Sequence, residues 1–170
     1  KEAEKIFGTP YLAGVPIGEE AWKSYFEVLL ATEESGVSRI FVPEVGGKQK
    51  HQTRVSWLLF HDALIAHSLR NYLRSQGKEV HCETVFPGQE AEDLEVEVCV
   101  KEECIAERIN EEDFDGIAAD PLLLALRLKK GIAELSLPHH AVSSRVCEKE
   151  RWNLLDEEAW KYRIGLEEGR

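Results

Sequence analysis

Apolar residues follow two spacings along the chain, one typical of helices and one typical of buried strands. A spacing of three to four residues in 18–30 and 63–76 gives each segment one apolar face and predicts two amphipathic helices. In the second helix, Arg70, Asn71 and Arg74 are expected to face outward. Short, largely apolar runs rich in aliphatic and aromatic residues predict strands. These runs are 54–60, 80–86, 96–100, 114–119 and 132–137.

Helices and strands alternate through the middle of the chain. Further helices are expected at 102–110 and around 122–128. Alternation of this kind predicts a parallel sheet joined by right-handed crossovers, with helices on both of its faces. The expected fold class is therefore α/β: a Rossmann-like, doubly wound parallel sheet flanked by helices in three layers.

The 170 residues fit one domain, because domains of about 100–200 residues are the rule. The tail carries Trp152, Trp160 and Tyr162 among many charges, which suits packing on the core or contact with a partner. The expected parts of this single domain are an N-terminal helix and loop at 1–52, a βαβ core at 53–147 and a C-terminal helical tail at 148–170.

Charge and hydropathy exclude two classes of partner. The 21 basic and 32 acidic residues give a net charge of −11, whereas binding to a phosphate backbone needs a basic surface, so no nucleic acid is expected. No apolar run approaches the roughly 20 residues that span a bilayer, and the start of the chain lacks the order of a signal peptide. We expect a cytoplasmic protein with no membrane partner. The sequence contains no methionine, which leaves open a processed end or a cut through a longer polypeptide.

The motifs of several enzyme classes are incomplete. The stretch Gly46–Lys48 lacks the earlier glycine and the following Ser or Thr of a phosphate-binding loop. No G-x-G-x-x-G follows a predicted strand, so there is no NAD signature. His81–Glu83 lacks the Pro-Cys-x-x-Cys partner of the zinc deaminases, and no Ser lies in a nucleophile elbow. Nicotinamide, nucleotide and hydrolase chemistry are therefore not expected.

The cysteines do not form a recognisable framework. Cys82, Cys99, Cys104 and Cys147 are few and widely spaced for a disulfide scaffold. They are expected to be free thiols or metal ligands.

Polar residues follow three of the predicted strands and mark the expected ligand site. In doubly wound sheets, ligands bind at the carboxyl ends of the strands, near the point where the strand order reverses. The candidate tips are His61–Asp62, Asp120–Pro121 and Pro138–His140.

Several segments in a fixed order point to one family. Residues 114–145 read as a strand, a small-residue-Asp-Pro tip, a helix, a strand and then Pro-His with Ala-Val-Ser-Ser. Upstream, 54–73 combines an aliphatic strand with an Ala-x-Ser-Leu-Arg-Asn-x-Leu helix, and Thr9–Pro10 and Pro16–Gly18 precede the first helix. Together these segments resemble the last α/β domain of the nitrogenase component 1 family.

The resemblance implies metallocofactor-dependent oxidoreduction or electron transfer, with an iron–sulfur or related metal cluster. It implies that His139, or alternatively His140, ligates or hydrogen-bonds the metal centre. Asp120 would then orient a neighbour or accept a hydrogen bond, and Arg145 would offset the charge of an anionic cluster. In this interpretation the chain is an oxidoreductase domain of nitrogenase-like type.

The family's cluster-binding cysteines lie mostly in earlier domains, and none of the cysteines here matches them. The site is therefore expected to be completed by another domain or chain, with a homo-oligomer or a related subunit as partner. The alternative is a non-catalytic scaffold, or a protein that binds a small ligand or a partner, that retains the fold.

Overall fold

The structure is a computed structural model that describes residues 2–43, 56–111, 113–128 and 131–137. Its elements, in chain order, are α1 (Glu2–Phe7), β1 (Leu12–Ala13), α2 (Glu19–Ser35), β2 (Arg39–Ile40), β3 (Ser56–Phe60), α3 (Ala63–Ser75), β4 (Glu79–Thr84), α4 (Gln89–Asp93), β5 (Glu97–Val98), α5 (Glu102–Ile109), β6 (Gly116–Ala119), α6 (Pro121–Leu124) and β7 (Ala133–Ser136).

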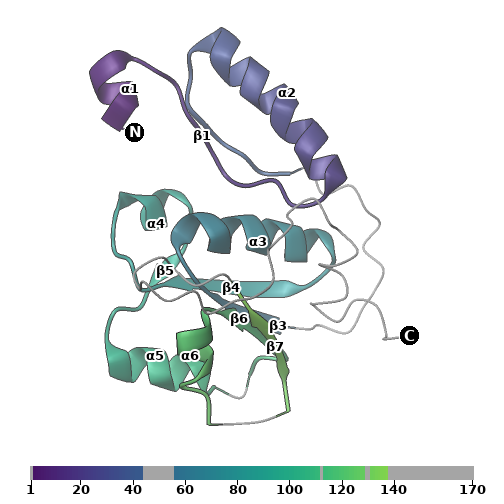
Figure 1. The fold of residues 1–170 in the computed structure, drawn as a ribbon, viewed down its shortest axis with the longest axis vertical. Coiled ribbons are helices and arrows are strands. Elements are labelled where there is room, and N and C mark those ends of the chain that lie inside the picture. Colours follow the sequence, from purple (N-terminus) through teal and green to yellow (C-terminus); the bar gives the residue numbers. More distant parts are fainter. Residues whose placement is uncertain (1, 44–55, 112, 129–130, 138–170) are drawn as a thin grey trace.

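Within the described residues, five parallel strands form the main sheet in the order β5-β4-β3-β6-β7. The chain moves outward from β3 to β5, then returns to the other side of β3 to form β6 and β7. Figure 1 shows α3 and α4 on one face of this sheet and α5 and α6 on the other. The predicted doubly wound, three-layer α/β fold is therefore confirmed, and its strand order reverses between β3 and β6.

Strand β3 lies at the centre of the core and is covered on both faces. Trp57 and Leu59 pack into the cluster on the α3 side, whereas Leu58 and Phe60 pack into the cluster on the α5 side. All four side chains are at most 2 % exposed. Burial on both faces explains why this strand has a continuous apolar run rather than an alternating one.

Arg70 on α3 is buried, so its predicted outward position is wrong. The guanidinium donates from Nη1 to the Glu95 carbonyl oxygen at 2.6 Å, and from Nη2 to the Leu94 carbonyl oxygen at 2.8 Å. These carbonyl groups belong to the turn after α4, which lies over α3 and includes the positive φ of 54° at Glu95. The turn supplies the acceptors that a buried guanidinium needs, whereas Arg74 is exposed as predicted.

The N-terminal region contains a small βαβ unit that the sequence pattern did not predict. Strands β1 and β2, which precede and follow α2 in the chain, pair in parallel. Each has only two residues, which is too few to show an alternation of apolar and polar positions. Helix α2 confirms the predicted helix. It ends at Gly36, which has a left-handed backbone conformation and whose amide donates to the Thr32 carbonyl oxygen. The unit is joined to α3 by a hydrogen bond of 2.9 Å from the Val15 amide to Ser68 Oγ.

Helix α6 is shorter than the predicted helix around 122–128. The side chain of Asn110, at the end of α5, donates to the Leu126 carbonyl oxygen at 3.2 Å and accepts from the Leu128 amide at 2.8 Å. A continuing helix would use these backbone groups internally. Asn110 therefore diverts the chain after Leu124 into turns.

The predicted tail at 148–170 and nearly all of the loop at 43–52 lie outside the described residues. No helix among the described residues is long and apolar enough to cross a membrane.

Gly116 is expected to tolerate no side chain. A Cβ at this position would lie 2.5–2.7 Å from ring atoms of Trp57, its partner across the β3–β6 ladder. Gly116→Ala should therefore lower the free energy of unfolding by about 1–3 kcal/mol, measured by urea denaturation. Gly88→Ala is the matched control, since no atom lies within 4 Å of its Cβ and its change should stay within about 0.5 kcal/mol. Equal effects of the two variants would contradict the predicted clash.

His67 is expected to make folding sensitive to acid. Its pKa is lowered, first by burial and then by the positive charge of Arg70, which donates to Nδ1 at 2.9 Å. Below about pH 6.5 the unfolded chain binds a proton that the folded chain does not, so stability should fall as pH falls, by at most about 1.4 kcal/mol per pH unit.

The measurement is urea denaturation between pH 7.5 and 5 for the wild type and His67→Gln, whose pH dependence should be shallower. The exposed residue His81 gives the control His81→Gln, which should follow the wild type. Parallel curves for the wild type and His67→Gln would show that this imidazole is not the group that titrates.

Candidate functional site

The candidate site lies at the carboxyl edge of the sheet, where β3 and β6 end side by side. Phe60 pairs with Ala119 across these strands. His61 and Asp62 follow the first strand, and Asp120 follows the second. The reversal of strand order thus lies between the two tips, as the sequence predicts for a ligand site.

Asp62 organises the first tip. Its Oδ1 accepts from the amides of Leu64 at 3.1 Å and Ile65 at 3.0 Å, which caps the N-terminus of α3. Its Oδ2 lies 2.6 Å from His61 Nδ1, and the His61 side chain is 5 % exposed. The carboxylate therefore fixes both the helix start and the orientation of the imidazole.

Asp120 organises the second tip in a similar way. Its Oδ1 accepts from the Leu122 amide at 2.8 Å, and Pro121 occupies the first turn of α6. Proline suits that position because its missing N–H would have no partner within the helix. Asp120 therefore accepts a hydrogen bond from its own helix, and its predicted role toward a cofactor stays a prediction.

The other predicted site residues, His139, His140 and Arg145, lie outside the described residues. The described chain reaches the same edge just before them. The Leu137 amide, which follows β7, donates to the Ala119 carbonyl oxygen at 2.8 Å. Leu137 is therefore held beside the strand end that leads into Asp120.

A cavity of about 440 Å³ opens at this edge, between the tips of β3 and β4. The wall formed by residues 86–90 was not predicted as a ligand site, although the Pro-Gly pair after a predicted strand marks a turn there. The lining residues are Asp62, Ala63, Phe86, Pro87, Gly88, Gln89 and Glu90.

Two buried cysteines lie on opposite faces of the sheet. Cys82 belongs to the core on the α3 side and Cys99 to the core on the α5 side. Burial raises the pKa of each thiol to about 12, and the neighbouring Cys104 thiol contributes at Cys99. Among the described residues, no group of three His, Cys, Asp or Glu side chains could hold a metal ion. These two thiols are therefore neutral at physiological pH and separated by the sheet.

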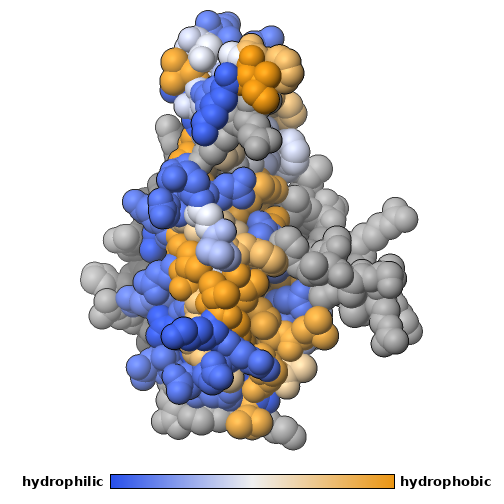
Figure 2. Space-filling view, turned by 90° about the vertical axis from the view of Figure 1, so that its left-hand side faces the viewer, coloured by the Kyte–Doolittle hydropathy of each residue, from blue (hydrophilic) through white to orange (hydrophobic). Residues whose placement is uncertain are grey.

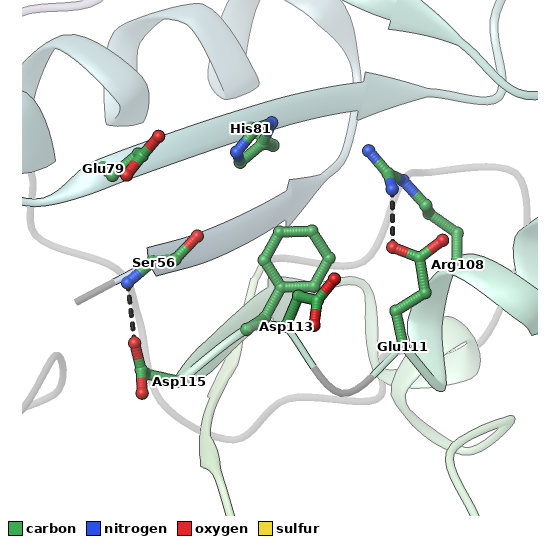
Figure 3. A pocket seen from close by; sticks show the side chains of 8 residues that line it. Ser56, Glu79, His81, Arg108, Glu111, Asp113 and Asp115 are labelled. Atoms are coloured by element: carbon green, nitrogen blue, oxygen red, sulfur yellow. Dashed lines mark hydrogen bonds and ion pairs between the residues drawn. The ribbon is translucent and has the colours of Figure 1, made fainter. Parts of the chain in front are cut away.

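A second hollow, of about 390 Å³, lies at the opposite, amino edge of the sheet. Figure 3 shows side chains from β3, β4 and α5 around it. Asp115 accepts there from the Ser56 amide at 2.8 Å, and Arg108 donates to Glu111 at 2.5 Å. Its remaining lining residues are Glu79, His81, Asp113 and Phe114.

Arg108 at this hollow also forms an ion pair with Glu83, a β4 residue that is 3 % exposed. Burial raises the pKa of Glu83, while the hydrogen bond from Arg108 acts in the opposite direction. Arg108 thus compensates a buried carboxyl group, which is a structural task. The carboxyl edge is therefore the stronger candidate for a functional site.

The two capping aspartates are expected to stabilise the helices that begin at the candidate site. Asp62→Ala should lower the free energy of unfolding by about 1–2 kcal/mol, because two α3 amides lose their acceptor. Asp62→Asn keeps an oxygen at this position and should lose less than half as much. Urea denaturation measures both variants, and equal losses would mean that the cap is not the source of the effect.

Comparisons with known proteins assign no family to this chain. No family model matches it, and neither a curated protein nor a solved structure does.

Proposed function

We propose that this chain is a nitrogenase-component-1-like α/β domain that takes part in metallocofactor-dependent oxidoreduction or electron transfer, with a site completed by another domain or chain. The observation that carries the proposal is the strand order. It puts the reversal point at His61–Asp62 and Asp120, and it brings Leu137 to the same edge. The Pro-His segment to which the resemblance assigns ligation begins directly after Leu137.

The buried thiols of the described residues do not fit ligation of a cluster. Iron–sulfur clusters are bound mainly by cysteine thiolates. Cys82 and Cys99 have pKa values of about 12 and face opposite cores, and the Cys82 thiol donates to the Ala66 carbonyl oxygen at 3.4 Å. In the proposal the partner supplies the thiolate ligands of the shared site, and this chain contributes His139 or His140.

The described residues have a supporting task in this proposal. Asp62 and Asp120 fix the starts of α3 and α6, so the two tips on either side of the reversal point are held by hydrogen bonds. The Pro-His segment follows Leu137, whose amide is hydrogen-bonded to Ala119 beside the second tip, so it begins from a defined position. Arg145 is proposed to offset negative charge at the shared site, as the resemblance implies.

A second candidate function is a scaffold, or a binding protein for a small ligand or partner, that retains the fold. The specific observation in its favour is the cavity of about 440 Å³ at the carboxyl edge, together with the buried, neutral thiols. In this alternative the edge binds a ligand or protein without redox chemistry.

Iron retention separates the two functions. The full chain is reconstituted anaerobically with ferrous iron and sulfide and desalted, and the retained iron and acid-labile sulfide are then measured with an electron paramagnetic resonance spectrum. The proposal expects weak retention that falls at least about tenfold in His139→Ala, because a lost ligand weakens metal affinity by at least this much. His140→Ala tests the alternative ligand.

Cys82→Ser and Cys99→Ser are the controls and should retain iron as the wild type does. Iron retention that depends on these thiols, or that is equal in the wild type and in both histidine variants, would contradict the proposed role of the Pro-His segment. In the second case the scaffold function would be favoured.

A further inference from the structure

The carboxyl edge carries exposed apolar side chains from two strand-to-helix connections, the edge strand β5 and helix α6. We call Phe86, Val98, Val100 and Leu122 the apolar edge. Their exposed fractions are 42 %, 45 %, 57 % and 59 %. Figure 2 faces this side of the molecule and shows apolar residues gathered between hydrophilic surfaces above and below. Large apolar residues gathered within a polar rim are typical of interaction surfaces.

The rim of the apolar edge is acidic. On one side, α4 carries the exposed residues Glu90 and Glu92, and on the other side α5 begins with the exposed Glu102 and Glu103. Lys101 is a base at the same end of α5. The acids therefore outnumber the bases at this rim, in agreement with the net charge of −11 for the whole chain.

This pairing of an apolar centre with an acidic rim decides what kind of partner fits. A second copy of the chain would bring the same glutamates against themselves, and like charges across an interface oppose association. A partner with an apolar centre bordered by Lys and Arg would bury the apolar edge and meet the glutamates with opposite charge. The cavity between the tips of β3 and β4, lined by Phe86, can receive one apolar side chain of such a partner.

We propose that the apolar edge is the docking surface for a different protein domain or chain whose apolar contact surface is bordered by basic residues. The proposal rests on the proposed function, since this partner would be the one that completes the site.

Helix α2 carries another set of exposed apolar residues, including Phe26 at 54 % and Leu30 at 58 %. Nothing in the described structure indicates what covers these α2 residues, so no docking surface is proposed there. They provide instead a surface on the same molecule where matched substitutions can be made.

The test uses the full chain and two synthetic amphipathic helical peptides of about 18 residues, long enough for an apolar stripe with charged borders. One peptide has a Leu stripe bordered by Lys, and the other has the same stripe bordered by Glu. Binding is measured by fluorescence anisotropy and mapped by changes in backbone amide NMR shifts. The Leu/Lys peptide should bind, with the largest shift changes in 86–103 and 120–126, and the Leu/Glu peptide should not.

Two double variants examine the apolar centre and the rim separately. Val98→Asp with Leu122→Asp should weaken binding of the Leu/Lys peptide at least about tenfold, as expected for central interface residues. Glu90→Lys with Glu102→Lys should weaken it several-fold, and more strongly at low salt. The changed residues are exposed, so the variants should fold, and circular dichroism checks this.

The matched controls carry the same changes on α2, namely Phe26→Asp with Leu30→Asp and Glu27→Lys with Glu33→Lys. They should bind as the wild type does. Any of three results overturns the docking proposal: equal loss of binding in the α2 variants, equal binding of the Leu/Glu peptide, or no binding of the Leu/Lys peptide. The third result would follow if residues 148–170 of the chain itself occupy the edge.

The docking proposal and the proposed function can fail separately. Iron retention that depends on His139, with no binding at the apolar edge, overturns the docking proposal alone. Binding at the apolar edge with no dependence of iron retention on His139 or His140 supports docking and contradicts the redox function.

Discussion

The close contact between β3 and β6 is the constraint on which the rest of the structure depends. Trp57 and Gly116 are partners across this ladder, and the indole occupies the space that a side chain on β6 would need. Because β6 can approach β3 there, the chain can return from β5 to the far side of the sheet centre. That return creates the reversal point and places the tips with Asp62 and Asp120 beside each other.

The two aspartates illustrate how one residue type serves fold and site together. Each follows a buried strand and lies at the carboxyl edge, and Asp62 accepts from two first-turn amides of its helix while Asp120 accepts from one. A carboxylate engaged in this way holds the backbone around it still. The apolar edge and the cavity beside it therefore surround a framework whose position is fixed before any ligand or partner arrives.

Much of the fold could be predicted from the sequence, because long apolar runs and helical spacing report burial directly. The runs that became β3, β4 and β6, and the helices α2 and α3, have this property. The burial of Arg70 and the turn imposed by Asn110 could not be predicted, since each depends on backbone carbonyl groups at least 16 residues away in the chain. The two-residue strands β1 and β2 have no pattern to read.

The candidate site could likewise be predicted only in part. The rule for doubly wound sheets located the carboxyl edge and the tips at His61, Asp62 and Asp120 from the order of elements alone. The hydrogen bonds that engage the two aspartates required three-dimensional positions, as did the exposure of Phe86, Val98 and Leu122 at the carboxyl edge. His139, His140 and Arg145 lie beyond the described residues, so their part of the site rests on the sequence.

The attachment of the N-terminal βαβ unit has a consequence for how the molecule opens. Helix α2 buries one side chain, Thr32, whereas α3 buries eight residues of its thirteen. Segments with few buried contacts open locally at lower free energy than the core does. The amides of α2 are therefore expected to exchange with solvent before those of α3, whose buried face lies in the main core.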